Sequence, residues 1–166
     1  MGAGKTTVGK KLARLMRMDF IDTDHLLEKK TGVSVSHIFE VEGESGFRDR
    51  ETRVLEEVSN GSPAVISTGG GAILRPENRM LMRKSGRVVY LRASCDLLWD
   101  RLKGCQNRPL LQTGQPRQVI DQLHKDRDPL YASEADVIVD VSTDSAYRTA
   151  QKILRKMKPD EQKVAN

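Results

Sequence analysis

Near its start the chain reads Gly2-Ala3-Gly4-Lys5-Thr6, and apolar residues recur at helical spacing directly afterwards. Glycines allow successive backbone N–H groups to point at one spot, because no Cβ blocks a ligand's approach. A helix beginning at Thr6 directs the positive end of its dipole there. The run matches the end of the phosphate-binding P-loop, G-x-x-x-x-G-K-[ST], whose lysine reaches the β- and γ-phosphates. The alternative is a glycine-rich turn with a solvated lysine. We predict a nucleotide phosphate site made by Gly2, Ala3, Gly4, Lys5, Thr6 and Thr7.

The complete P-loop has an earlier glycine, two positions ahead of Met1 in this numbering, and it follows a buried strand. We therefore expect roughly ten further residues upstream that form this strand. The Thr6 hydroxyl is the expected direct ligand of Mg²⁺, with Asp22 behind it through a water molecule, because Mg²⁺ keeps several waters in proteins. For Asp22 the alternative is a simple cap at a strand end.

Composition favours a single globular domain that buries its own core. The chain has 166 residues, of which 37% are hydrophobic and 31% charged. Cys95 and Cys105 form no metal-like cluster and indicate reduced thiols in a cytoplasmic protein. The net charge of +5 comes with only 4% aromatic residues and no dense basic run, which favours small anionic substrates over nucleic acid. No apolar run is long enough for a membrane span. We predict a domain over 1–158 and a tail over 159–166.

Short apolar runs alternate with segments of helical periodicity, the pattern of a parallel sheet covered on both faces. Ligands of such sheets bind beyond the carboxyl ends of the strands, where the P-loop, Asp22, Asp24 and the glycines 69–71 should meet. The polar stretch 104–117 lacks periodicity and is expected to form a lid. The expected strands are 18–21, 64–67, 87–91 and 136–141; the expected helices are 6–17, 25–32, 34–41, 44–59, 75–84, 95–101, 118–126 and 144–157.

Several spaced motifs follow the P-loop in order, and together they are more specific than the P-loop alone. The motifs are Phe20-Ile21-Asp22-Thr23-Asp24, Gly43-Glu44-Ser45-Gly46-Phe47-Arg48-Asp49-Arg50-Glu51, Thr68-Gly69-Gly70-Gly71, Arg108-Pro109-Leu110-Leu111 and Arg127-Asp128-Pro129-Leu130-Tyr131. With these motifs the chain resembles the bacterial shikimate kinases from Met1 to about residue 150.

The resemblance implies an acceptor site. Asp24 would bind the acceptor hydroxyl and take its proton; the alternative is a cap for the following helix, and both could hold at once. Arg48 and Arg127 would bind the carboxylate of shikimate, which guanidinium forks match well. Glu44 and Glu51 lie within one helical turn of Arg48, so the alternative for that group is a solvated ion pair. The turn Gly69, Gly70, Gly71 would line the acceptor.

The resemblance also implies a lid arginine and an adenine site. Arg108 would close on the transferring phosphate, with a surface loop arginine as the alternative. Arg101 would stack on the adenine ring, and the turn ending at Asp144 would border its edge. The catalytic set would then be Asp24, Lys5 and Arg108.

The implied fold is a P-loop kinase with a five-stranded parallel sheet of order 2-3-1-4-5, one strand lying upstream of Met1. The implied reaction transfers the γ-phosphoryl group of ATP, with Mg²⁺, to the 3-hydroxyl of shikimate, in a monomer without membrane or nucleic-acid partners. One alternative is another small P-loop kinase, acting on gluconate or a nucleoside monophosphate. The other is a non-catalytic ATP-binding regulator, which would leave Asp24, Arg48 and Arg127 without a joint purpose.

Overall fold

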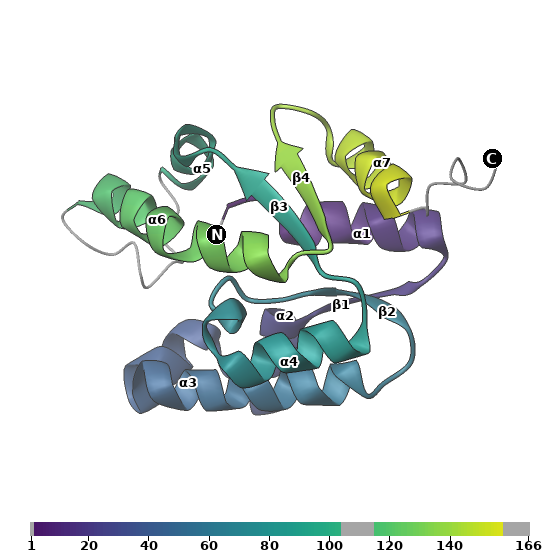
Figure 1. Ribbon diagram of the computed structural model, residues 1–166. Helices are drawn as coiled ribbons and strands as arrows, with labels where there is room; N and C mark the ends of the chain where they lie inside the picture. Colours follow the sequence, from purple (N-terminus) through teal and green to yellow (C-terminus); the bar gives the residue numbers. More distant parts are fainter. Residues whose placement is uncertain (1, 104–114, 158–166) are drawn as a thin grey trace, which may run out of the picture.

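The computed structural model describes residues 2–103 and 115–157, and in them parallel strands alternate with helices (Figure 1). The strands are β1 (Asp19–Asp22), β2 (Ala64–Ser67), β3 (Val89–Ala93) and β4 (Val137–Val141). The helices are α1 (Lys5–Met16), α2 (Thr23–Thr31), α3 (Val35–Ser59), the short 3₁₀ helix η1 (Ala72–Leu74), α4 (Pro76–Ser85), α5 (Cys95–Leu102), α6 (Pro116–Glu134) and α7 (Ala146–Met157).

The described strands form two separate parallel pairs. In one pair β1 lies beside β2, with Asp22 opposite Ser67 at the carboxyl ends; in the other β3 lies beside β4, from Val89 opposite Val137 onward. Helices provide the crossovers that parallel strands require. In the expected order 2-3-1-4-5, these pairs match the neighbours 2-3 and 4-5. The strand number five and the complete order stay predictions.

A cavity of about 440 Å³ lies between the two strand pairs. Residues of β2 and β3 line two of its sides, and α1 and α7 contribute Val8, Leu12 and Ile153. This is the place that the order 2-3-1-4-5 gives to the first strand. The upstream strand itself stays a prediction.

Two apolar clusters explain why the helices lie where they do. On one face α1 packs on α7, and Leu12 and Ile153 join Val139 of β4 in a buried cluster (Figure 1). On the other face α3 packs against α2 and α4, with Leu27 and Phe47 in its own cluster. Apolar burial on both faces is the pattern that a parallel sheet requires.

The two helices expected over 34–41 and 44–59 are both present. They run together as α3 across a kink at Gly43, which lies between them and has φ 69° and ψ −176°. Helix α6 begins at Pro116 and continues to Glu134 with Pro129 inside it, so the expected end near residue 126 is wrong. Proline suits a first helical turn, and inside a helix it normally predicts an end.

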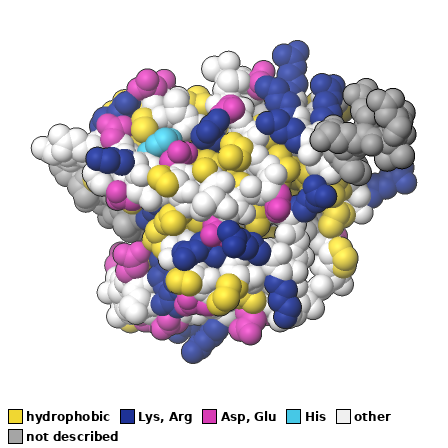
Figure 2. Space-filling model, in the orientation of Figure 1, with side chains coloured by type: hydrophobic (Ala, Val, Ile, Leu, Met, Phe, Trp, Pro, Cys, Tyr) yellow, Lys and Arg dark blue, Asp and Glu magenta, His cyan; other side chains and the backbone are white. Residues whose placement is uncertain are grey.

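Charged side chains are spread over the surface. On the face drawn in Figure 2, Lys and Arg side chains lie in several separate groups, with Asp and Glu among them. Within residues 2–103 and 115–157, no helix is both long and apolar enough to cross a membrane.

Candidate active site

The P-loop residues form the cap of α1. Gly4 is the N-cap with φ 89° and Gly2 has φ 75°, both in the left-handed region that favours glycine. No side chain caps this helix end, and no acidic residue lies in its first turn. Its positive end therefore suits an anion such as a phosphate group. Lys5 lines the cavity described below.

Thr6 and Asp22 are in direct contact at this helix end. The Thr6 hydroxyl donates to Oδ2 of Asp22 at 2.7 Å, while Oδ1 of Asp22 accepts from the backbone N–H of His25 at 3.4 Å. A hydroxyl beside a carboxylate is the oxygen donor set that Mg²⁺ prefers. The described residues contain no group of three or more His, Cys, Asp or Glu arranged to hold a metal ion by themselves. The pair therefore fits Mg²⁺ held partly by phosphate oxygens and water.

Asp22, and not Asp24, is the N-cap of α2, which corrects the capping alternative for Asp24. The chain enters the helix two residues earlier than expected, so Asp24 lies in the first turn, where the helix dipole favours its negative charge. The strand-end cap considered for Asp22 is confirmed, in addition to its contact with Thr6.

Arg48 is buried, with 7% of its surface exposed. Nη1 donates to Oε2 of Glu51 at 2.6 Å, and Nη2 donates to Oε1 of Glu44 at 3.1 Å. Burial alone lowers the pKa of Arg48, but the two carboxylates outweigh it and the pKa is raised. Burial and the nearby charge of Asp24 raise the pKa of Glu51, although Arg48 acts to lower it. The solvated ion pair considered for Arg48 is therefore wrong.

The glycine turn after β2 lies directly against these groups. A Cβ on Gly69 would be 2.3 Å from Oε1 of Glu51 and 3.0 Å from Oδ1 of Asp24. A Cβ on Gly71 would be 2.1 Å from Nη2 of Arg48. The distances of 2.3 and 2.1 Å would force Glu51 and Arg48 to shift, and 3.0 Å is a tight contact. Glycine therefore lets the turn touch Asp24 and Arg48, the two residues predicted to contact the acceptor.

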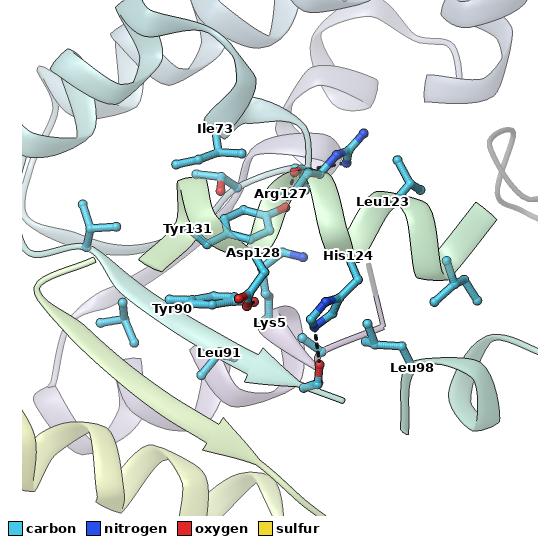
Figure 3. A pocket seen from close by; sticks show the side chains of 18 of the residues that line it. Lys5, Ile73, Tyr90, Leu91, Leu98, Leu123, His124, Arg127, Asp128 and Tyr131 are labelled. Carbon is cyan, nitrogen blue, oxygen red and sulfur yellow. Dashed lines mark hydrogen bonds between the residues drawn. The ribbon is translucent and has the colours of Figure 1, made fainter. Parts of the chain in front are cut away.

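Arg127 approaches the same turn from α6. Its Nη1 donates to the carbonyl oxygen of Gly70 at 3.3 Å, and the hydroxyl of Tyr131 donates to that same oxygen. Figure 3 shows both side chains pointing from α6 to this carbonyl. A cavity of about 130 Å³ lies here, and its lining includes Lys5, Gly70, Arg127 and Tyr131. Residues of α1, of the glycine turn and of α6 therefore line the same cavity.

The predicted adenine residues lie at the other side of the P-loop. Arg101 donates to the carbonyl oxygens of Gly2 and Ser142, each at 3.2 Å. Asp144 accepts from Nζ of Lys152 at 2.6 Å, and its backbone N–H donates to the Ser142 hydroxyl at 3.3 Å. Arg101 therefore ties the P-loop to the turn before α7. Adenine contact by Arg101 and Asp144 stays a prediction.

The lid expected over 104–117 falls mostly outside the described residues, because 104–114 are not described and Arg108 is among them. Pro116 and Arg117 belong to α6, so the end of the expected lid is corrected.

Sequence reasoning missed two residues of the site. Thr23 is buried; its hydroxyl donates to the Ser67 carbonyl at 3.3 Å and accepts from the Gly69 N–H at 3.3 Å. Tyr131 contacts Gly70. Thr23 stands between the two aspartates of one motif, and Tyr131 ends another. Their presence in the motifs was the available signal, but their partners are distant in sequence.

A sequence model of the shikimate kinase family matches residues 1–158. The chain belongs to the shikimate kinase family. It is 50% identical over 140 residues to the shikimate kinase of Aromatoleum aromaticum, covering 84% of this chain and 80% of the relative. With the shikimate kinase of Cupriavidus pinatubonensis it shares 49% identity over 157 residues, 95% of this chain and 82% of the relative.

Solved structures of the family have the same fold. The shikimate kinase of Acinetobacter baumannii, solved in complex with shikimate, superposes with a TM-score of 0.89 at 46% identity, over 93% of this chain and 87% of that one. The Bacteroides thetaiotaomicron enzyme gives 0.84 at 35% identity, over 93% and 92%.

These matches confirm the predicted α/β P-loop kinase fold and the predicted family. The chain is a shikimate kinase, an enzyme that uses ATP and Mg²⁺ in the shikimate pathway of aromatic amino acid synthesis. The alternatives of a gluconate or nucleoside monophosphate kinase and of a non-catalytic regulator are wrong.

Proposed function

We propose that Asp24, Arg48, Gly69, Gly70, Gly71 and Arg127 bind shikimate, and that the γ-phosphoryl group of ATP passes to its 3-hydroxyl. The observation that carries the proposal is the glycine turn, which lies against Asp24 and Arg48 and accepts a hydrogen bond from Arg127 at the Gly70 carbonyl. The A. baumannii relative, solved with shikimate, supports the same substrate. The products are shikimate 3-phosphate and ADP.

Two guanidinium groups hold the substrate carboxylate. Glu51 and Glu44 fix the Arg48 fork before substrate arrives, so little side-chain freedom is lost on binding. Arg127 reaches the turn from α6. Two forks from different elements recognise a planar carboxylate better than point charges would, because each offers paired N–H donors.

Asp24 orients the acceptor hydroxyl and accepts its proton. The transition state of phosphoryl transfer is loose, so this role is mainly positioning. Lys5 and the positive end of α1 bind the phosphates through Gly2, Ala3, Gly4 and the backbone of Thr6 and Thr7. When bound by Thr6, with Asp22 behind it through water, Mg²⁺ would neutralise phosphate charge.

The remaining assignments rest on the motifs that define the family. We assign lid closure on the transferring phosphate to Arg108 and adenine contact to Arg101 and Asp144. The contact of Arg101 with Gly2 supports its place beside the nucleotide. We further propose a single kinase domain over 1–158 followed by a tail over 159–166, with a lid near 104–115, that acts as a cytoplasmic monomer binding only ATP and shikimate.

A coupled assay of ADP release tests the proposal, with Mg²⁺-ATP and shikimate, gluconate or AMP as acceptor. Turnover only with shikimate is expected, and Asp24→Asn should lower kcat by about a hundredfold or more, the range of a positioned proton acceptor. Asp126→Asn, an exposed change on α6, serves as the matched control and should leave the rate unchanged. Turnover with a different acceptor, or full activity of Asp24→Asn, would contradict the assignment.

A further inference from the structure

Helix α6 places three contacts of the site within about one helical turn. Arg127 and Tyr131, four residues apart and therefore on one face, both donate to the carbonyl oxygen of Gly70. Asp128, between them, accepts from the hydroxyl of Tyr90 on β3 at 2.7 Å. Figure 3 shows these side chains around one cavity.

The Tyr131 ring is held in place by β3. It stacks on the Tyr90 ring with centroids 4.8 Å apart and an interplanar angle of 28°. Burial raises the pKa of Tyr131, and burial together with Asp128 raises the pKa of Tyr90. Both hydroxyls therefore stay protonated at neutral pH and remain hydrogen-bond donors.

A shared carbonyl gives Tyr131 a role distinct from that of Arg127. When Arg127 turns toward a substrate carboxylate, it withdraws a donor from the Gly70 oxygen. An orphaned carbonyl in a partly buried turn costs free energy, and this cost would weaken substrate binding. The hydroxyl of Tyr131 still donates a hydrogen bond to the Gly70 oxygen, so moving Arg127 to the substrate carboxylate costs less free energy.

The same bond fixes the turn relative to α6. The turn also lies against Asp24 of α2 and Arg48 of α3. A turn that is held by these helices and by α6 keeps the two carboxylate anchors, Arg48 and Arg127, at one separation. A small displacement of either anchor is expected to weaken a bidentate contact.

We propose that Tyr131 is a positioning residue of the acceptor site: it holds the Gly70 carbonyl and so releases Arg127 to the substrate carboxylate. This inference rests on the proposed binding of shikimate at the glycine turn. The proposed role concerns the acceptor site alone. Loss of the Tyr131 hydroxyl should therefore change the KM for shikimate and leave the KM for ATP nearly unchanged.

The test is Tyr131→Phe, which keeps the ring and its stacking on Tyr90 but removes the hydroxyl. We expect KM for shikimate to rise about tenfold, with KM for ATP changed by less than about twofold. Tyr147→Phe, a change at an exposed tyrosine on α7, is the matched control and should change neither constant. The shikimate Kd from calorimetry without nucleotide should rise by the same factor as KM.

A double-mutant comparison shows whether Tyr131 acts through Arg127. If it does, Tyr131→Phe adds less than about twofold to the KM for shikimate in an Arg127→Ala background. A full tenfold addition there would overturn the coupling. Unchanged shikimate constants in Tyr131→Phe, or equal losses for shikimate and ATP, would overturn the inference while the proposed function stands. If the unmodified chain shows no turnover with shikimate, the proposed function fails and the inference fails with it.

Discussion

Arg48 shows how one residue can combine a substrate contact with a buried ion pair. Its guanidinium donates hydrogen bonds to Glu44 and Glu51 and lies close against Gly71. Removing the Arg48 side chain would leave the buried carboxylate of Glu51 unpaired. An alanine variant would therefore lose stability as well as substrate binding, and the two effects could not be told apart. Substitutions that keep the charge are therefore the informative ones.

Arg48→Lys keeps the charge but replaces the planar fork by a point charge. We expect KM for shikimate to rise about tenfold or more, while KM for ATP stays within about twofold. Arg50→Lys, two residues away and paired with Glu42 at the surface, is the matched control. Steady-state kinetics with each substrate varied in turn measures the difference. An unchanged shikimate KM would show that Arg48 does not bind the carboxylate.

Glu51→Gln should change how stability depends on pH. Burial raises the pKa of Glu51 above its ordinary value of 4.5, so its contribution to stability is complete below that pH and is lost as pH rises through the folded-state pKa. Removing this group should make the free energy of unfolding rise more steeply with pH between about 4.5 and neutrality. Denaturant unfolding at a series of pH values measures the slope.

Glu42→Gln provides a control of opposite sign. The hydrogen bond from Arg50 lowers the pKa of Glu42, so that contribution is present above the ordinary value and lost as pH falls through the folded-state pKa. The change should flatten the slope below about pH 4.5. Identical slopes for both variants and the unmodified chain would contradict the assignment for Glu51.

At the level of elements, the site is a turn held between helices. Helix α2 contributes Asp24 beside Gly69, α3 contributes Arg48 beside Gly71, and α6 contributes Arg127 beside Gly70. These elements are far apart in sequence, and the strand pair β1–β2 brings α2 and the turn together. The turn is therefore the element least tolerant of added volume.

Gly71→Ala tests this tolerance. The backbone of Gly71 has φ −97°, which any residue adopts, so the whole effect comes from the Cβ placed 2.1 Å from Arg48. We expect about 1–3 kcal/mol lower stability to unfolding, together with a raised KM for shikimate. Gly86→Ala is the control, because a Cβ there has nothing within 4 Å and its φ of 174° is extended. Equal stability of the two variants would show that the turn can yield.

At the level of the whole molecule, the cavity of about 440 Å³ separates β1–β2 from β3–β4. Apolar side chains of α1 and α7 face it, and an empty apolar volume of this size forfeits packing and burial. We propose that an extended segment joined ahead of Gly2 fills it as a strand between β2 and β3.

Comparing the chain with and without the roughly ten upstream residues tests this proposal. With the segment present, the free energy of unfolding should rise by at least about 3 kcal/mol, because the cavity is filled and both facing strand edges are paired. Shikimate-dependent activity should rise in parallel, because Lys5 lies at the cavity edge. Denaturant unfolding and the ADP-release assay measure both. Equal stability and activity in the two forms would rule out the strand.

Much of this protein follows from local sequence patterns. The residues of the P-loop, the alternation of strands with helices and the ordered motifs predicted the fold, the family and the acceptor candidates. The start of the helix expected over 95–101 was also predicted correctly; Ser94 caps it as α5, and capping depends on a few neighbouring residues. The end of α6 was not, because a proline inside a helix is tolerated only when the surrounding structure supports it.

What only the tertiary structure decided is which groups share a partner. Sequence placed Arg48 near two glutamates, but its burial depends on how α3 packs against the glycine turn. The meeting of Arg127 and Tyr131 at one carbonyl depends on α6 crossing a turn some sixty residues earlier in the chain. Local patterns specify elements and residue chemistry, whereas contacts over such separations are set by packing of the whole chain.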